Sequence, residues 1–360
     1  MSVKNAGRVA YLVMVLLLAG FCLTSAAYAQ TVEDYFKRGI SYYNQKNYDA
    51  AIAEYTKALN IDAKYPALFY NRGLAYLDKQ SYDYAISDFS KVIESGPNDA
   101  QNSDAYINRG LARHYKNDFD GAISDYNKAL ELRPNTALIY RNRGLVYEDK
   151  KDLDQALSDF TKAIQADPNY APAYKSRARI NDVKGNLEQS GADYTKAIEI
   201  NSGDALAYAS RGYIYKRLGQ NEQAYADFGK SIQLNPNNAD AYTGRGLTYV
   251  SEGKSDTAIP DFNKAISLDP SFPNSYLGRG LAYVVKNEPD KAIPDYNKAL
   301  SLSPDFADAY YGRGLAYYQK KNYKQSVQDM KKAQSLGYTV EPQYLQEPTQ
   351  GTTQSGGQNP

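Results

Sequence analysis

A glycine that recurs at intervals of about 34 residues constrains the fold of this chain more than any other feature of its sequence. One interval, from Gly73 to Gly110, is slightly longer, and Ala178 stands once in place of the glycine. A period of this length is typical of a repeat array, in which each repeat is one small group of packed elements. The glycines in phase are Gly39, Gly73, Gly110, Gly144, Gly212, Gly246, Gly280 and Gly314.

Counting this glycine as the eighth residue divides the chain into nine repeats. An aromatic residue then occupies the fourth position of every repeat, tyrosine the eleventh of most, alanine the twentieth and an aromatic residue the twenty-fourth. Spacings of four and seven residues place these side chains on one face of each of two helices, so the sequence predicts an all-α fold. Proline near the end of most repeats cannot continue the second helix. The repeats are 32–65, 66–102, 103–136, 137–170, 171–204, 205–238, 239–272, 273–306 and 307–340.

This pattern resembles the tetratricopeptide repeat (TPR) family, and the resemblance covers residues 32–340. It implies a TPR solenoid, a right-handed superhelix of about nine helix-turn-helix repeats. The resemblance also implies that the first helices of the repeats line a concave groove, which in this family usually receives a peptide or protein segment.

An arginine stands at the seventh position of every repeat, where the family commonly has an aliphatic residue, and an acid stands at the twenty-third. The arginine neighbours the helix-contact glycine and the acid neighbours the helix-contact aromatic, so we expect the two to pair. The pairs would form a structural Arg–acid ladder along the repeats; the alternative is an anion-binding track of arginines. Four of the nine expected pairs are Arg72 with Asp88, Arg109 with Asp125, Arg143 with Asp159 and Arg211 with Asp227.

Three asparagines occupy the sixth position of successive repeats, which the resemblance places in the groove. Asn71, Asn108 and Asn142 could form a short row of amides that grips an extended peptide backbone, because each amide both donates and accepts hydrogen bonds. The alternative is simple solvation of a polar helix face.

Five basic residues gather at groove positions of the fourth to sixth repeats. A focused positive patch attracts an acidic segment or a polyanionic glycan. Nearby acids, Glu148, Asp149 and Asp182, are expected to neutralise part of it. The five candidate binding residues are Arg141, Lys175, Arg179, Lys216 and Arg217.

Residues 1–29 have the pattern of a secretory signal peptide. Lys4 and Arg8 precede an uncharged run, and Ala27 and Ala29 form an A-x-A cleavage site. We expect cleavage after Ala29 and a periplasmic or secreted mature chain with no membrane span. The alternative is an N-terminal membrane anchor, because the stretch from Val9 to Ala29 carries no charge and a bilayer span needs roughly 20 residues. At the other end, residues 341–360 are expected to form a disordered tail, apart from a short turn around Gln343 to Gln346 that covers the last repeat.

Composition argues against catalysis and against several classes of partner. The sequence has one histidine, His114, which we expect to face solvent, and its glycines belong to helix contacts and form no phosphate-binding loop. Cys22 is the only cysteine and lies in the signal segment, so the mature chain has no cysteine ligand. Removing Lys4 and Arg8 leaves 40 basic against 41 acidic residues, unlike a nucleic-acid binder.

We therefore expect a non-enzymatic protein–protein interaction scaffold of the bacterial cell envelope that binds a peptide or protein segment in the groove. No catalytic residue, metal site or cofactor is expected. The alternative is an accessory protein that binds or guides an exported polysaccharide, because sugars stack on tyrosine rings, of which the sequence has 36.

Overall fold

A computed structural model describes residues 31–96 and 100–348 of the chain. Within these residues every regular element is a helix, which confirms the expected all-α fold. The predicted signal peptide, residues 1–29, lies outside the described residues. None of the described helices is both long and apolar enough to cross a lipid bilayer.

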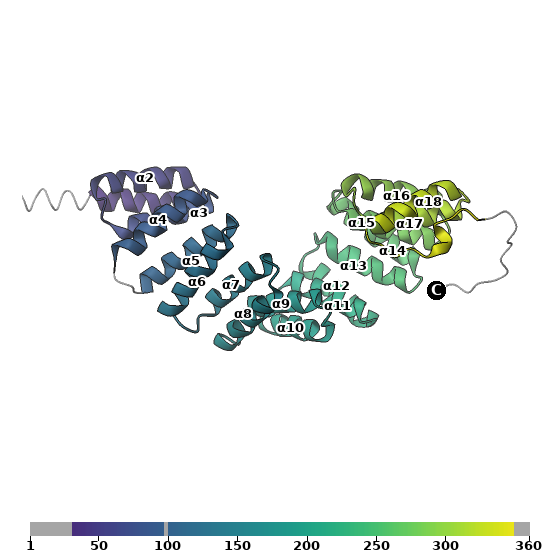
Figure 1. Ribbon diagram of the computed structural model, residues 1–360, viewed down its shortest axis with the longest axis horizontal. Helices are drawn as coiled ribbons and strands as arrows, with labels where there is room; N and C mark the ends of the chain where they lie inside the picture. The colour runs from purple at the N-terminus through teal and green to yellow at the C-terminus, as the bar shows by residue number, and fades with distance from the viewer. Residues whose placement is uncertain (1–30, 97–99, 349–360) are drawn as a thin grey trace, which may run out of the picture. The chain divides into compact units, whose positions relative to one another are not determined.

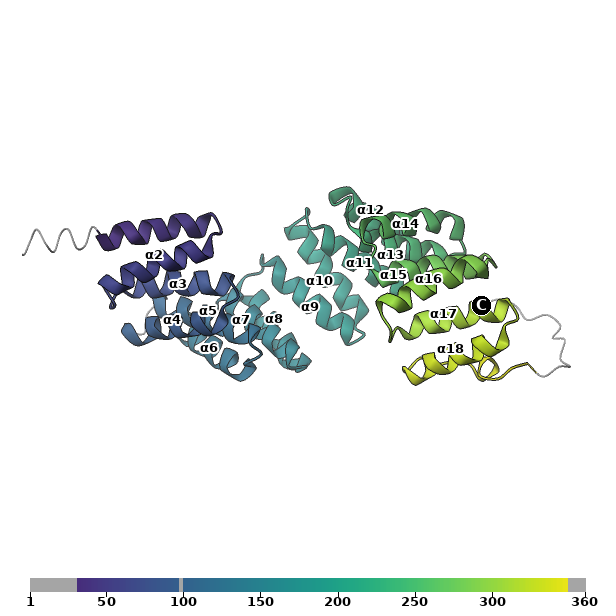
Figure 2. The same ribbon diagram turned by 90° about the horizontal axis from the view of Figure 1, so that it is seen from above.

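The helices form two compact bodies, and the division falls after Ile180, inside α9 (Ala171–Val183). In each body successive helices lie side by side (Figures 1 and 2). The N-terminal body contains a first helix over residues 31–44, α2 (Tyr48–Ile61), α3 (Pro66–Asp78), α4 (Tyr82–Ser95), α5 (Ala100–Tyr115), α6 (Phe119–Leu132), α7 (Ala137–Asp149) and α8 (Leu153–Ala166).

The C-terminal body follows α9 and has the same alternation of first and second helices. It contains α10 (Leu187–Ile200), α11 (Ala205–Arg217), α12 (Asn221–Leu234), α13 (Ala239–Ser251), α14 (Ser255–Leu268), α15 (Pro273–Val285), α16 (Pro289–Leu302), α17 (Ala307–Gln319), α18 (Tyr323–Ser335) and the short 3-10 helix η1 (Pro342–Tyr344).

Local sequence sets the turn between the two helices of a repeat. Asn117 and Lys151 adopt positive φ angles of 62° and 65°, which reverse the chain after the first helix. The next residue, Asp118 or Asp152, accepts a hydrogen bond from the amide three residues later and so caps the second helix.

The phased glycine allows the two helices of a repeat to pack closely. A Cβ atom on Gly73 would lie 2.9 Å from the ring of Phe89, and one on Gly144 would lie 2.6 Å from Phe160. Both rings are fully buried. The aromatic ring at the twenty-fourth position therefore packs into the groove that the glycine at the eighth position leaves on the facing helix.

A second glycine in the last repeats packs between repeats. Gly278, at the sixth position, faces Phe262 of the preceding repeat, where an added Cβ would lie 2.3 Å from the ring. Gly244 and Gly312 meet Phe228 and Tyr296 in the same way, at 2.4 and 2.5 Å. In these repeats the sixth position is therefore buried between neighbours and does not line a groove.

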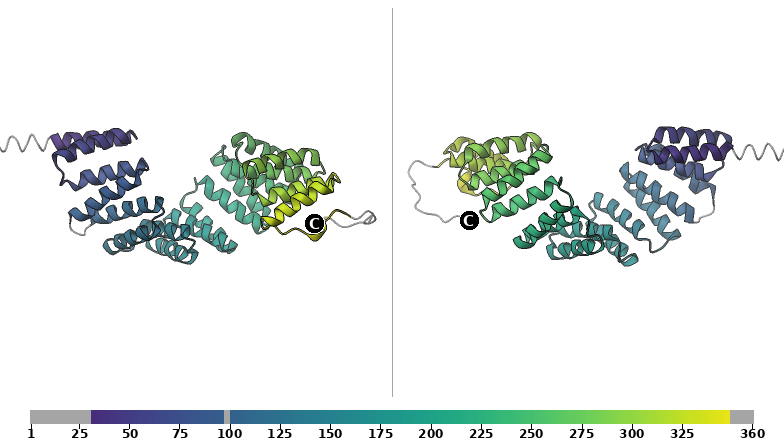
Figure 3. Two further views of the ribbon diagram at one scale, coloured as in Figure 1. Left: turned by 45° about the horizontal axis from the view of Figure 1, so that its top comes forward. Right: turned by 180° about the vertical axis from the view of Figure 1, so that it is seen from behind.

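The segment after α18 folds back over the last repeat, as the yellow chain beyond α18 in Figure 3 shows. The ring of Tyr338 stacks on Tyr311 with centroids 4.4 Å apart, and Val340 and Leu345 pack with Met330. The short turn expected here over the last repeat is present as η1, and the structure describes the chain to residue 348. Residues 349–360 lie outside the described residues.

The close approach at Gly278 gives a test of the packing between repeats. Gly278→Ala is expected to cost about 1–3 kcal/mol of stability, because the new methyl group overlaps Phe262. Thermal and urea unfolding followed by circular dichroism would measure the loss.

A matched control is Gly229→Ala in α12, where an added Cβ meets nothing within 4 Å. This variant is expected to be neutral or more stable by up to about 1 kcal/mol, because alanine favours the helix. Equal stability of the two variants would contradict the packing argument.

Candidate functional site

The seventh-position arginine of each of eight repeats binds the acid of the same repeat within the described residues. In repeat 2, Nε and Nη2 of Arg72 donate to Oδ2 and Oδ1 of Asp88, each at 2.8 Å. This two-point geometry adds strength and orientation to an ion pair. The other pairs are Arg38–Glu54, Arg109–Asp125, Arg143–Asp159, Arg211–Asp227, Arg245–Asp261, Arg279–Asp295 and Arg313–Asp329.

Most of these pairs are shielded from solvent, and Arg38, whose side chain is 50% exposed, is the exception. In repeat 4 the side chain of Arg143 is 15% exposed and that of Asp159 is 3% exposed. The hydrogen bonds that Arg143 donates to Asp159 raise the pKa of its guanidinium group. An arginine held in this way is committed to a carboxylate of the same chain, and this favours the structural interpretation over an anion-binding track.

The arginine also contacts the preceding repeat, a feature that the sequence analysis missed. Nη1 of Arg72 donates to Oγ1 of Thr56 at 3.0 Å, and Nη1 of Arg211 donates to Oγ1 of Thr195 at 3.0 Å. Both acceptors stand at the twenty-fifth position. A serine, threonine or asparagine recurs at this position, and this recurrence in the sequence could have predicted the contact. These residues are Thr56, Ser90, Asn127, Thr161, Thr195, Asn263 and Asn297.

Repeat 7 is the exception to this link. Arg245 binds Asp261 through two hydrogen bonds, but Gly229 stands at the twenty-fifth position of the preceding repeat and has no side chain to accept a third. Arg245 makes no other hydrogen bond among the described residues.

The three predicted groove asparagines bind their own surroundings. Nδ2 of Asn71 donates to the carbonyl of Ala67 at 2.8 Å, and Nδ2 of Asn108 donates to Tyr70 and to the Asp104 carbonyl, each at 3.0 Å. The Oδ1 of Asn142 lies 3.5 Å from Nη1 of the adjacent Arg141. Both amide hydrogens of Asn108 and one of the two of Asn71 are therefore already used.

The structure pairs two of the five predicted patch cations with the expected acids. Nε of Arg179 donates to Glu148 at 2.8 Å in the N-terminal body, and Arg217 binds Asp182 in the C-terminal body. The third nearby acid, Asp149, accepts from Nε2 of His114 at 2.6 Å. The His114 side chain is only 13% exposed, so the expectation that it faces solvent is wrong.

Two predicted patch cations lack a carboxylate partner among the described residues. In the N-terminal body, Nε of Arg141 is buried without an acceptor, and the hydroxyl of the fully buried Tyr126 is likewise unpaired. In the C-terminal body, Lys216 forms no ion pair within the described chain, and burial lowers the pKa of its ammonium group. Lys175 is half-buried on α9.

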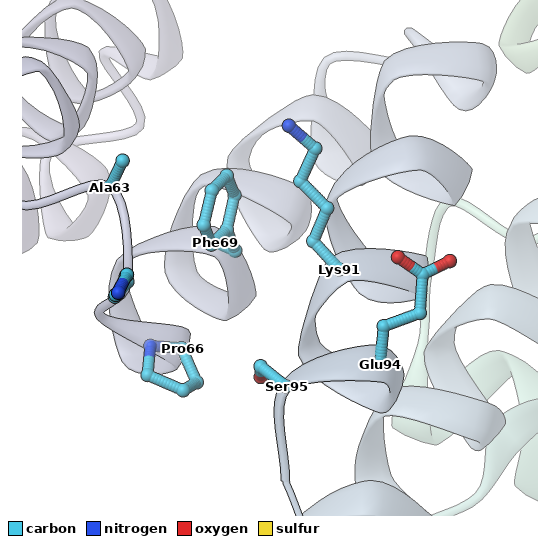
Figure 4. A pocket seen from close by; sticks show the side chains of 7 residues that line it. Ala63, Pro66, Phe69, Lys91, Glu94 and Ser95 are labelled. Carbon is cyan, nitrogen blue, oxygen red and sulfur yellow. The ribbon is translucent and has the colours of Figure 1, made fainter.

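A pocket of about 410 Å³ lies in the N-terminal body, between the start of α3 and the end of α4. Figure 4 shows Lys91 and Phe69 on opposite sides of it, with the Lys91 ammonium 4.9 Å from the ring centroid. Glu94 and Lys64 also line the pocket. No group of three potential metal ligands occurs among residues 31–96 and 100–348.

The fold and its repeated contacts define a helix-turn-helix repeat protein. Family models described as "TPR repeat" match residues 39–80, 110–151, 212–253, 246–287 and 282–321, and models described as "Tetratricopeptide repeat" match 66–99, 137–170, 193–226 and 307–336. These matches cover more than half of the chain, which therefore belongs to the tetratricopeptide repeat family. Proteins of this family are generally non-catalytic scaffolds for protein–protein interaction.

Two solved structures show the same fold. A tetratricopeptide repeat protein from Parabacteroides merdae is 24% identical, with a TM-score of 0.58 over 68% of this chain and 97% of its own. The APC/C hetero-tetramer Cut9-Hcn1 is 19% identical, with a TM-score of 0.56 over 85% of this chain and 73% of the matched chain. No curated protein sequence matches the chain.

A double-mutant cycle on Arg143 and Asp159 tests the ladder. Arg143→Ala strands the Asp159 carboxylate, which is 3% exposed, and is expected to cost about 2–3 kcal/mol, between the values of exposed and buried pairs. Asp159→Ala should cost a similar amount, and the double variant should cost less than the sum. Urea unfolding of the four proteins would measure the coupling, and its absence would refute the pairing.

Arg245→Ala serves as the comparison, because Arg245 has only the two bonds to Asp261. Its loss should be smaller than that of Arg143→Ala, which also breaks the bond to Asn127 of the preceding repeat.

Proposed function

We propose that this chain is a non-enzymatic scaffold of the bacterial cell envelope that holds an acidic segment of a partner protein on the surface of its first helices. Membership of the tetratricopeptide repeat family supports the interaction role. The proposal rests on one observation in the structure: among the predicted patch cations, Arg141 and Lys216 have no carboxylate partner in the described residues.

The unpaired state of these cations gives a reason for binding. No carboxylate of the described residues neutralises either positive charge, so each attracts an acidic group of a partner. At Arg141 the half-buried hydroxyl of Tyr170 lies within electrostatic range of the guanidinium. Arg141 acts within the N-terminal body and Lys216 within the C-terminal body, so each would engage its own stretch of the partner.

The envelope assignment rests on residues 1–29, in which charged, apolar and small residues follow in the order of a secretory signal. Export would place the scaffold where it meets other envelope proteins. A polysaccharide partner is the second candidate, and the exposed tyrosines of α4 and α5 favour it at a different surface.

Substitution of the two unpaired cations tests the binding role. Crosslinking in envelopes of the native bacterium, followed by mass spectrometry, would measure the yield of each protein adduct. Arg141→Gln and Lys216→Met are each expected to lower the yield of the main adduct by about tenfold, the effect of a charge-assisted hydrogen bond. Lys216→Met should also leave stability unchanged or raised, because it removes a buried unpaired charge.

Lys150→Met is the matched control for Arg141. It removes one positive charge from the same body, but Lys150 pairs with Asp120 on an exposed edge. Its adduct yield should equal that of the wild type. Unchanged yields of the main adduct for both Arg141→Gln and Lys216→Met would refute the proposal.

The export proposal has its own measurement. Cell fractionation followed by intact-mass analysis should find a soluble chain that begins at Gln30. A chain that keeps residues 1–29 and sediments with the membrane would establish the anchored alternative instead.

A further inference from the structure

Two stacked tyrosine pairs flank the first turn of α4 in the N-terminal body. Tyr84 stacks on Tyr76 with ring centroids 5.0 Å apart and planes 23° apart. Tyr82, two residues earlier on the same helix, stacks on Tyr115 at 5.4 Å and 26°. The pairs join α4 to α3 on one side and to α5 on the other.

The outer ring of each pair is open to solvent. Tyr84 is 65% exposed and Tyr115 is 56% exposed, and both exceed every other tyrosine of the described chain. Large aromatic rings normally contribute their area to a core or an interface, so two such exposed rings beside one helix turn indicate a binding surface.

Stacking fixes the orientation of these exposed rings. Each outer ring stacks on its partner tyrosine and still exposes more than half of its surface to solvent. Behind the first pair, the guanidinium of Arg72 lies 5.9 Å from the Tyr76 ring and is itself held by Asp88. These contacts restrict the rotation of the outer rings before any ligand arrives, which reduces the entropy lost on binding.

Polar side chains lie next to the tyrosines of the second pair along the chain. Lys116 forms an ion pair with Asp83, and Nε2 of His114 contacts Oδ2 of Asp149 at 2.6 Å. The His114 ring lies parallel to Tyr115, at an angle of 4°. The carboxylate of Asp149 is half-exposed, so it can accept further hydrogen bonds beside the Tyr115 ring.

From this arrangement we propose that the tyrosine pairs Tyr76–Tyr84 and Tyr82–Tyr115 form a binding surface for a neutral polysaccharide of pyranose sugars. The flat C–H face of a pyranose ring matches an exposed tyrosine face, and its hydroxyl groups donate to a carboxylate such as Asp149. An anionic polymer is disfavoured, because Lys116 and Arg72 are each already paired with an acid.

This surface is separate in its residues from the proposed protein contacts. It contains neither Arg141 nor Lys216, so a failure of one proposal leaves the other standing. Arg141→Gln lies in the same body and is expected to leave glycan binding unchanged.

Affinity electrophoresis of the mature chain provides the test. Native gels that contain hydroxyethyl cellulose should retard the wild type relative to polymer-free gels, and tyrosine fluorescence should report the titration of cellohexaose. Tyr84→Ala and Tyr115→Ala should each weaken cellohexaose binding by about tenfold, whereas Tyr84→Phe and Tyr115→Phe keep the ring and most of the affinity.

Tyr318→Ala is the matched control, because Tyr318 is an exposed tyrosine of the C-terminal body that meets its neighbours edge-on. It should bind as the wild type does. The proposal fails if the wild type is not retarded, if the alanine variants with wild-type melting temperatures bind equally well, or if retardation occurs only in gels that contain alginate.

Discussion

The arginine at the seventh position connects most repeats to themselves and to the preceding repeat, and the order of these repeats depends on it; repeat 7 lacks the second connection. Through two nitrogens it binds the acid on the second helix of its own repeat, and through the third it binds the second helix of the preceding repeat. One side chain thus fixes both the angle within a repeat and the stacking between repeats. A planar guanidinium with five donors can do this, and a lysine cannot.

Glycines make this arrangement possible, because the arginine reaches its partners only when the helices are close. The eighth-position glycine admits the aromatic ring of its own repeat, and in repeats 7 to 9 the sixth-position glycine admits the ring of the preceding repeat. In earlier repeats Asn71 and Asn108 stand at the same sixth position, and their amides bind carbonyls of their own helices. One position therefore serves packing in one body and local hydrogen bonding in the other.

Ion pairs within the chain also determine which charges a partner can reach. Arg179 and Arg217 are held by Glu148 and Asp182, so much of the predicted basic patch is neutral. What remains is chemically distinct: two isolated cations without acids, and two tyrosine pairs whose outer rings face solvent. These features favour two kinds of partner at separate sets of residues.

The sequence by itself determined the repeat period, the two helices of each repeat and the pairing of Arg72 with Asp88 and its counterparts, because each depends on contacts that recur at a constant spacing. Only the tertiary structure decided the rest. It showed that Thr56 completes the arginine contacts and that Gly278 packs against Phe262. It also showed that Val340 and Leu345 pack with Met330, and that Arg141 lacks an acid while Arg179 has one. These outcomes depend on which side chains of neighbouring repeats come within a few ångströms of each other, and a residue's position in its own repeat does not specify what the next repeat places opposite it.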